Sequence, residues 1–286
     1  MKISVSSYSF HQYIKAGKLT QFECVARAKE MGFDAIEFTE LNGDTLEEQK
    51  TLAAEIKKEA ERVGIEINAY TIGANLYHDC AEDSEREVAR LCGQLEVAKL
   101  LGAKVMRHDV CYKLGKSGRA RSFELMLPVI AENARKVTEY AETLGIRTCT
   151  ENHGFIAQDS DRVERLFNTV AHDNYGLLVD MGNFLCADED PIRAVSRVAP
   201  YAVHVHAKDF IYFDEAVEGR TIMTRGANYI AGTVIGEGVV PVRQCLKILK
   251  RAGYDGYVSV EYEGREDCIA GIARGLENLK RFISEI

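Results

Sequence analysis

The 286-residue sequence lacks the features of several common classes of protein. It has no lysine- or arginine-rich tract and a formal net charge of −8, whereas proteins that bind a nucleic-acid backbone usually carry a basic stripe. Its eight cysteines include no CxxC pair, so a reduced cytoplasmic interior fits them better than a disulfide framework. Neither a secretory leader nor a long apolar run is evident. We therefore expect a cytoplasmic protein with no membrane partner and no nucleic-acid partner.

Proline is scarce, with four residues, and no GxGxxG turn follows the first strand-like run, which argues against an open, doubly wound sheet. The sequence instead alternates short β-branched or aromatic-rich runs with amphipathic stretches of helical period. The strand-like runs are residues 2–7, 34–39, 65–72, 103–109, 145–151, 175–180, 201–207 and 256–262. Eight such units predict an α/β fold of the (β/α)8 TIM-barrel type, as a single domain over residues 1–286, because such a barrel needs about 250 residues.

Several helix-like stretches end in a glycine that also precedes the next strand-like run. These glycines are Gly32, Gly64, Gly102, Gly145 and Gly253. A glycine at this position can adopt the left-handed conformation that closes a helix. Pro128 sits inside a helical pattern and is expected either to kink that helix or to mark its start.

The fifth to eighth strand-like runs each end in a side chain that can bind a metal ion. These side chains are Glu151 in TCTENHG, Asp180 in GLLVDMGN, His206 in AVHVHAKD and Glu261 in YVSVEYEG. In a TIM barrel the carboxyl ends of all strands lie on one face, where catalytic groups stand. Three carboxylates and one imidazole suit Mn²⁺, Mg²⁺ or Co²⁺ better than a thiolate-type zinc site, although Zn²⁺ remains compatible. Such an ion acts as a Lewis acid and stabilises the enediolate that forms when a carbon-bound proton is removed.

These assignments have competing interpretations. Asp180 could instead cap the helix that follows its strand. His204 lies two residues before His206 and points to the same face, but His206 is nearer the strand end and is preferred as the ligand. His204 is then expected in the barrel interior or beside the ligands. By the same reasoning Glu261 is preferred to Glu263.

The strings ENHG, VDMGN, HAKD and VEYEG, with the turn IGEGVVP, resemble the xylose-isomerase-like barrels known as sugar phosphate isomerases and epimerases. The resemblance covers nearly the whole chain. It implies that Glu151, Asp180, His206 and Glu261 bind one divalent metal ion. In the ketose 3-epimerases of this group the two glutamates also form the acid/base pair, so the resemblance implies that Glu151 and Glu261 are catalytic.

One departure from the ketose epimerases is clear. They carry a histidine three residues after the aspartate of the sixth strand, where this chain has Asn183. The Asp-x-Gly-Asn form, with His-x-Lys-Asp, is closer to the inosose dehydratases and to uncharacterised epimerases of the family. Arg225, in the long segment between the seventh strand and IGEG, is a candidate contact to substrate hydroxyls. That segment is expected to cover the substrate.

Other residues are weaker candidates for substrate binding. Asn183 and Lys208 could contact substrate oxygens, although Lys208 could equally be a solvated lysine at a strand end. His153 could bind substrate or only orient a metal ligand. Glu37 and His108 occupy plausible positions at the barrel mouth, and either could instead be a structural residue.

The preferred functional hypothesis is a divalent-metal-dependent isomerase or epimerase that acts on a ketose or a related small sugar. The alternative is a lyase or dehydratase acting on a keto-inositol or a 3-keto-glycoside, since proton abstraction begins both reactions. Endonuclease-type barrels share the fold, but they need more mouth histidines and a basic face. The lack of a glycine-rich phosphate loop favours an unphosphorylated sugar. The exposed helices of such a barrel could pair in a homo-oligomer.

Overall fold

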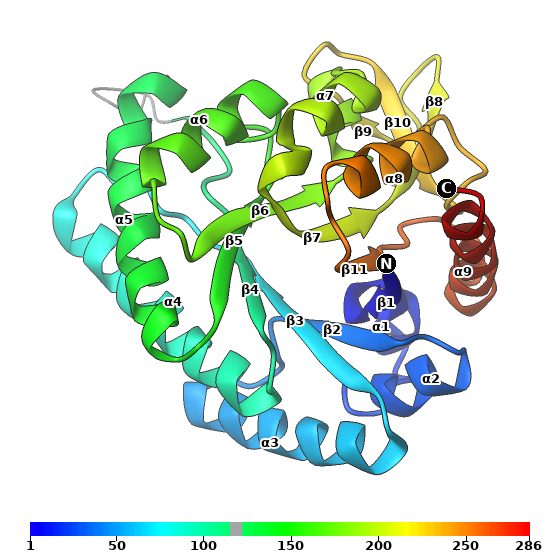
Figure 1. The fold of residues 1–286 in the computed structure, drawn as a ribbon, viewed down its shortest axis with the longest axis horizontal. Coiled ribbons are helices and arrows are strands. Elements are labelled where there is room, and N and C mark those ends of the chain that lie inside the picture. The colour runs from blue at the N-terminus through cyan, green and yellow to red at the C-terminus, as the bar shows by residue number, and fades with distance from the viewer. Residues whose placement is uncertain (115–121) are drawn as a thin grey trace.

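The computed structural model describes residues 1–114 and 122–286 and contains a closed barrel of eight parallel strands (Figure 1). The strands follow one another around the barrel in chain order. They are β1 (Lys2–Ser6), β2 (Ala35–Thr39), β3 (Glu66–Ile72), β4 (Val105–His108), β5 (Arg147–Glu151), β6 (Tyr175–Asp180), β7 (Ala202–Ala207) and β11 (Tyr257–Val260). The predicted α/β fold of the (β/α)8 TIM-barrel type is therefore confirmed.

Helices between the strands surround the barrel (Figure 1). They are α1 (His11–Lys15), α2 (Cys24–Glu30), α3 (Leu46–Val63), α4 (Ala81–Leu101), α5 (Phe123–Thr143), α6 (Ser160–Val170), α7 (Pro191–Val198), α8 (Val242–Arg251) and α9 (Cys268–Ser284). Short 3-10 helices span Ser7–Phe10 (η1), Asn183–Ala187 (η3) and Ala199–Tyr201 (η4). Among the described residues, none of the helices combines the length and the apolar character that crossing a membrane requires.

Local sequence signals set the ends of these helices. The Thr45 hydroxyl accepts from the Glu48 backbone N–H while the Glu48 side chain accepts from the Thr45 N–H, so α3 begins with a capping box. The five glycines predicted to follow helices all have positive φ, between 71° and 91°, which confirms their role. Helix α5 continues through Pro128, which lies in its second turn rather than at its start.

The segment that was expected to be a covering loop forms a second, smaller sheet. Strands β8 (Asp209–Phe213), β10 (Tyr229–Thr233) and β9 (Ile222–Met223) pair in that order and are antiparallel. Asp209↔Thr233 and Phe213↔Tyr229 are the ends of the β8–β10 register. The sheet follows β7 directly, with only Lys208 between β7 and β8.

Asp209 fastens this sheet to the turn that precedes α8. Its carboxylate accepts hydrogen bonds of 2.9 Å from the backbone N–H groups of Gly236, Gly238, Val240 and Phe210. A Cβ on Gly238 would lie 2.2 Å from Asp209 Oδ1, so the turn can approach the carboxylate this closely only with glycine there. The motifs HAKD and IGEGVVP thus form one structural unit.

Replacing Asp209 with alanine is expected to lower the free energy of unfolding by about 2–4 kcal/mol, because two buried and two partly buried N–H groups would lose their acceptor. Urea unfolding of the variant and the wild type measures the difference. Asp173→Ala removes an exposed carboxylate and serves as the control. A change in the Asp209 variant no larger than that of the control would contradict this role for Asp209.

Candidate metal centre

Four side chains converge at the carboxyl ends of neighbouring barrel strands. Glu151 and Asp180 end β5 and β6, His206 lies in β7, and Glu261 follows β11 directly. One ligand atom of each side chain lies within 4.8 Å of the ligand atoms of the others. His206 Nδ1 is 3.3 Å from Glu261 Oε2, 3.7 Å from Glu151 Oε1 and 3.9 Å from Asp180 Oδ2. The four residues expected from the sequence are thus brought together at one point.

The atoms that face this point lack hydrogen-bond partners. Asp180 Oδ2, His206 Nδ1 and Glu261 Oε2 are buried, and within the described part of the chain none of them makes a hydrogen bond, although the Lys208 ammonium pairs with both carboxylates. Buried polar atoms are nearly always satisfied, so a cluster of acceptor atoms left together calls for a cation. The donor set therefore fits a divalent metal ion.

Asp180 accepts hydrogen bonds from the segment that follows its strand and also faces the cluster. Its Oδ1 accepts from the backbone N–H groups of Gly182 (2.8 Å) and Asn183 (2.9 Å), at the start of η3. Its Oδ2 points to the cluster. Burial raises the pKa of this carboxyl to about 7, since neighbouring carboxylates oppose its ionisation and Lys208 only partly offsets them. A side chain at Gly182 would collide with the Lys208 backbone, which explains the glycine of VDMGN.

Glu37 lies beneath His206 rather than in the barrel mouth. It is fully buried; Oε1 lies 2.8 Å from His206 Nε2, and Oε2 pairs with His204 Nε2. The expected substrate contact is therefore replaced by a contact behind the cluster. With Nε2 against a carboxylate, His206 is oriented to present Nδ1 to the other ligands. His204 lies in the barrel interior, beside His206, with the two ring centroids 5.4 Å apart.

A second buried network holds the other carboxylate oxygen of Glu151, Oε2. Arg107 Nε donates to Glu151 Oε2 (2.6 Å), and Arg107 Nη2 contacts the same oxygen. Burial opposes the ionisation of Glu151, but Arg107 and His206 outweigh it and hold the pKa of this carboxyl well below its usual value. Arg107 Nη2 also lies 3.3 Å from Asp109 Oδ1, which is 2.9 Å from His153 Nδ1.

Arg107 and Asp109 were not singled out in the sequence. Arg107 stands in the strand-like run VMRHD, between an apolar residue and a histidine. An arginine inside a barrel strand needs a buried counter-charge, and this was the available signal. Tyr112 completes the network, since its hydroxyl donates to Asp109 Oδ2 at 2.6 Å.

Lys208 is buried, so it is not a solvated lysine at a strand end. Its Nζ lies 2.7 Å from Glu261 Oε2 and 3.5 Å from Asp180 Oδ2, and donates to Asn183 Oδ1 at 3.3 Å. Asn183 in turn donates from Nδ2 to Glu151 Oε1 at 2.9 Å. Lys208 and Asn183 therefore connect the carboxylates that β5, β6 and the end of β11 bring to the cluster. They were predicted as substrate contacts, and Lys208 also lines the adjoining cavity.

A cavity of about 270 Å³ opens onto the cluster. It is lined by Tyr8, Thr39, Glu40, Thr71, Gly73, Arg107, Glu151, His153, Lys208, Glu261 and Glu263. His108 and Arg225 are not among them. His108 is fully buried, with Nδ1 2.9 Å from the Asp109 carbonyl oxygen. Arg225 donates to Asp159 Oδ2 and to the Phe155 carbonyl oxygen, both at 2.7 Å, so its guanidinium fastens the loop after β5 instead.

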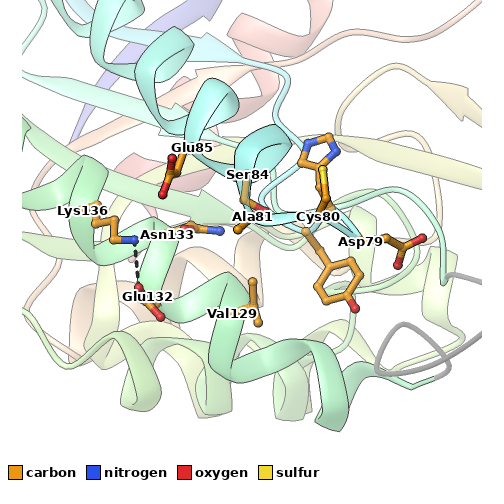
Figure 2. A pocket seen from close by; sticks show the side chains of 11 residues that line it. Asp79, Cys80, Ala81, Ser84, Glu85, Val129, Glu132, Asn133 and Lys136 are labelled. Carbon is orange, nitrogen blue, oxygen red and sulfur yellow. Dashed lines mark ion pairs between the residues drawn. The ribbon is translucent and has the colours of Figure 1, made fainter.

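A larger hollow of about 640 Å³ lies apart from this cavity, between the start of α4 and helix α5 (Figure 2). Its lining shares no residue with the cavity at the cluster. Figure 2 shows the ion pair of Lys136 with Glu132 on its wall, at 2.8 Å. In the ranges the structure describes, no residue of the four-residue cluster lines this hollow. The volume of a cavity therefore does not by itself identify the candidate functional site.

Two curated relatives share part of this sequence. The rhizopine catabolism protein MocC of Rhizobium meliloti is 27% identical over 256 residues, covering 84% of this chain and 74% of that protein. An inosose dehydratase of Yersinia enterocolitica is 28% identical over 166 residues, covering 54% of each chain. The chain thus spans about half the length of that dehydratase.

Two solved structures are similar over nearly their whole length. The IOLI protein with a bound zinc atom has a TM-score of 0.78 at 18% identity, covering 100% of this chain and 99% of that one. D-psicose 3-epimerase with D-tagatose, from Clostridium cellulolyticum H10, has a TM-score of 0.77 at 15% identity, covering 99% of each chain. At these identities the likeness concerns the fold. A sequence model of one family also matches residues 25–282. The chain belongs to the xylose isomerase-like TIM barrel family.

Proposed function

We propose that Glu151, Asp180, His206 and Glu261 bind one divalent metal ion. The supporting observation is the convergence of three buried acceptor atoms without hydrogen-bond partners, completed by Glu151 Oε1. Carboxylates with one imidazole favour Mn²⁺, Mg²⁺ or Co²⁺, and Zn²⁺ is also compatible. When bound, the ion supplies Lewis acidity, which lowers the energy of the enediolate left after proton removal beside a carbonyl group.

We infer that the enzyme removes a proton from the carbon next to the carbonyl group of a small polyhydroxylated ketone, a keto-inositol or a related sugar. The cavity beside the cluster is small and lined mainly by polar side chains, which suits a substrate rich in hydroxyl groups. The inosose dehydratases among the relatives, and the epimerase among the structural neighbours, act on compounds of this kind according to their names.

His153 is the side chain best placed to take that proton. It lines the cavity, and its side chain is 40% exposed. Asp109 holds its Nδ1 at 2.9 Å, which leaves Nε2 as the nitrogen available to a substrate. Glu151 is less suited to this work, because Arg107 holds one of its oxygens while Asn183 donates to the other.

The site thus has one side chain well placed to exchange a proton, His153, and not two, which favours dehydration over epimerisation. In an elimination, His153 Nε2 takes the proton from the α-carbon and returns it to the hydroxyl that leaves the β-carbon, so water departs and a carbon–carbon double bond forms. A single acid/base group suffices for these steps. We therefore propose a dehydratase as the primary function.

Epimerisation is the second candidate, and the placement of the two glutamates supports it. Glu151 and Glu261 approach the cluster from β5 and from the end of β11, with β6 and β7 between them in the barrel. If metal binding releases Glu261 from Lys208, two carboxylates can face the substrate from different sides, as in a two-base reaction. In that case Glu151 and Glu261 are the catalytic pair.

One experiment separates these functions. The protein is freed of metal, reloaded with Mn²⁺, Co²⁺, Mg²⁺ or Zn²⁺, and incubated in D₂O with keto-inositols and D-ketohexoses. Proton NMR then follows deuterium uptake next to the carbonyl group. An unsaturated product identifies dehydration, and a stereoisomer without unsaturation identifies epimerisation. The absence of metal-dependent exchange across the panel would contradict both functions.

Replacing Glu37 with glutamine is expected to weaken Mn²⁺ binding about 10- to 100-fold, because His206 would lose the buried carboxylate that orients its ring. Titration calorimetry with Mn²⁺ measures the affinity, and the melting temperature of the metal-free variant checks that it folds. Glu277→Gln, at an exposed position on α9, is the control for the lost charge. Equal affinities in the two variants would refute this role of Glu37.

A further inference from the structure

We infer that the substrate carries no anionic group at its end remote from the metal ion, and that Glu263 is the residue that excludes such groups. The inference rests on the proposed function and concerns the substrate class of the same site. Glu263 lines the cavity and lies two residues beyond the ligand Glu261. It takes no part in the four-residue cluster.

The charges around the cavity sum to a negative value. The carboxylates are those of Asp109, Glu151, Asp180, Glu261 and Glu263, and the cations are Arg107 and Lys208. Five carboxylates against two cations leave three negative charges, of which a divalent ion would cancel two. Glu40, which lines the cavity as well, adds a sixth carboxylate, so within the described residues a bound substrate meets a surplus of negative charge even when the metal ion is present.

Of the two glutamates beside Lys208, Glu263 is the one whose negative charge is less well neutralised. Lys208 Nζ is 3.4 Å from Glu263 Oε1 but 2.7 Å from Glu261 Oε2, so the single ammonium is shared between them. The Glu263 side chain is 28% exposed, whereas that of Glu261 is 11% exposed. Glu40, which also lines the cavity, adds a second exposed carboxylate whose nearest cation is Arg90 at 3.7 Å.

Among the described residues, the arginine and the lysine that line the cavity are both already paired with protein carboxylates. Arg107 already contacts the carboxylates of Glu151 and Asp109 and donates from Nη1 to the Ile72 carbonyl oxygen at 3.1 Å. Lys208 is occupied as described above. Proteins usually bind phosphate or carboxylate groups through the paired N–H donors of an arginine guanidinium. The arginine that lines this cavity already donates to protein carboxylates. Hydroxyl groups, by contrast, can donate to Glu40 and Glu263.

Glu263 also lines a second, neighbouring hollow. It measures about 450 Å³ and is lined by Glu263, Arg220 and Arg265 among others. Glu263 thus lines both this arginine-containing hollow and the cavity at the cluster. An anionic group that reached past Glu263 would find these arginines, so the carboxylate decides whether such groups enter.

The test compares the binding of myo-inositol and myo-inositol 1-phosphate to Mn²⁺-loaded protein by calorimetry. Neither probe is a ketone, so binding is measured without turnover. We expect the phosphate to bind at least about tenfold more weakly than the neutral polyol. Glu263→Gln should reduce this difference to about threefold or less, while Glu277→Gln, which removes the same charge at an exposed site, should leave it unchanged. Raising the salt concentration should narrow the difference in the wild type, since exposed charges are screened within about 3 Å at 1 M salt.

Equal or tighter binding of the phosphate to the wild type would overturn the inference. If Arg220→Ala abolished that binding, the phosphate would occupy the neighbouring hollow. An unchanged preference in Glu263→Gln would remove Glu263 from the explanation, and failure of both probes to bind would contradict a polyol site altogether. If the ketones exchange deuterium but the protein binds myo-inositol and its 1-phosphate equally well, this inference is wrong while the proposed reaction stands. If the protein prefers the neutral polyol but no ketone exchanges deuterium, the proposed reaction is wrong while this inference stands.

Discussion

Replacing Asp180 with asparagine is expected to abolish metal binding and leave the metal-free protein at least as stable as the wild type. Asparagine can keep the two backbone hydrogen bonds that Oδ1 accepts from Gly182 and Asn183. It removes the buried, unpartnered Oδ2 charge, which is costly without a cation and necessary with one. The wild type should gain about 2.7 kcal/mol of stability from Mn²⁺ at 100 times its dissociation constant, and the variant should gain none.

Thermal unfolding of both proteins with and without Mn²⁺ provides the measurement. The control is Asp173→Asn, at an exposed position, which should respond to the metal as the wild type does. A variant that is stabilised by Mn²⁺ to the wild-type extent would show that Asp180 is no ligand. A metal-free variant that is clearly less stable than the wild type would show that the carboxylate serves the fold as well.

Replacing His153 with glutamine is expected to lower kcat about 10²- to 10⁴-fold with little change in Mn²⁺ affinity, since general acid/base catalysis contributes a factor of this size. The ring lines the cavity but contributes no atom to the ligand group. The loss should therefore appear in the chemical step and in deuterium exchange, and metal calorimetry should be nearly unchanged.

Two companion variants make the result specific. Asp109→Asn should lower kcat in the same direction, because the His153 ring would lose the carboxylate that holds Nδ1. His78→Gln changes a histidine on the wall of the separate hollow and should retain full activity. If His153→Gln kept its rate while Glu151→Gln or Glu261→Gln lost both rate and exchange, the two-carboxylate mechanism of an epimerase would be favoured.

Much of the fold could be predicted from the sequence, because a barrel repeats one local pattern. The alternation of strand-like and helix-like runs placed every barrel strand to within a few residues, and the glycines after helices have the left-handed conformation expected of them. The convergence of Glu151, Asp180, His206 and Glu261 followed from that topology, since the carboxyl ends of parallel strands share a face.

The height of each side chain along the barrel axis could not be predicted from the sequence. Glu37 is the middle residue of β2 and contacts His206 Nε2, whereas Glu151 is the last residue of β5 and lies near His206 Nδ1. The strands of a barrel are tilted and staggered, so the height of a residue depends on the registers between all strands rather than on its own position in sequence. The same staggering brings Arg107 to Glu151, a contact between residues 44 positions apart.

The small sheet escaped prediction for another reason. Its strands are short, and β9 has two residues, so its pattern cannot be told from that of a loop. Arg225 was expected to contact substrate because it lies in this segment. Its guanidinium is instead held by Asp159 and by a backbone carbonyl group of the loop after β5, contacts that no local sequence signal encodes.

The anchoring of that sheet bears on how fast substrate can come and go. Moving β8 away from the barrel would break the bonds between Asp209 and the backbone N–H groups of the turn before α8, and would pull on Lys208 and His206 directly upstream. Opening would therefore disturb the ligands themselves. We therefore expect the sheet to stay fixed against the barrel rather than to swing as a hinged flap, so that its motion does not limit the rate of turnover.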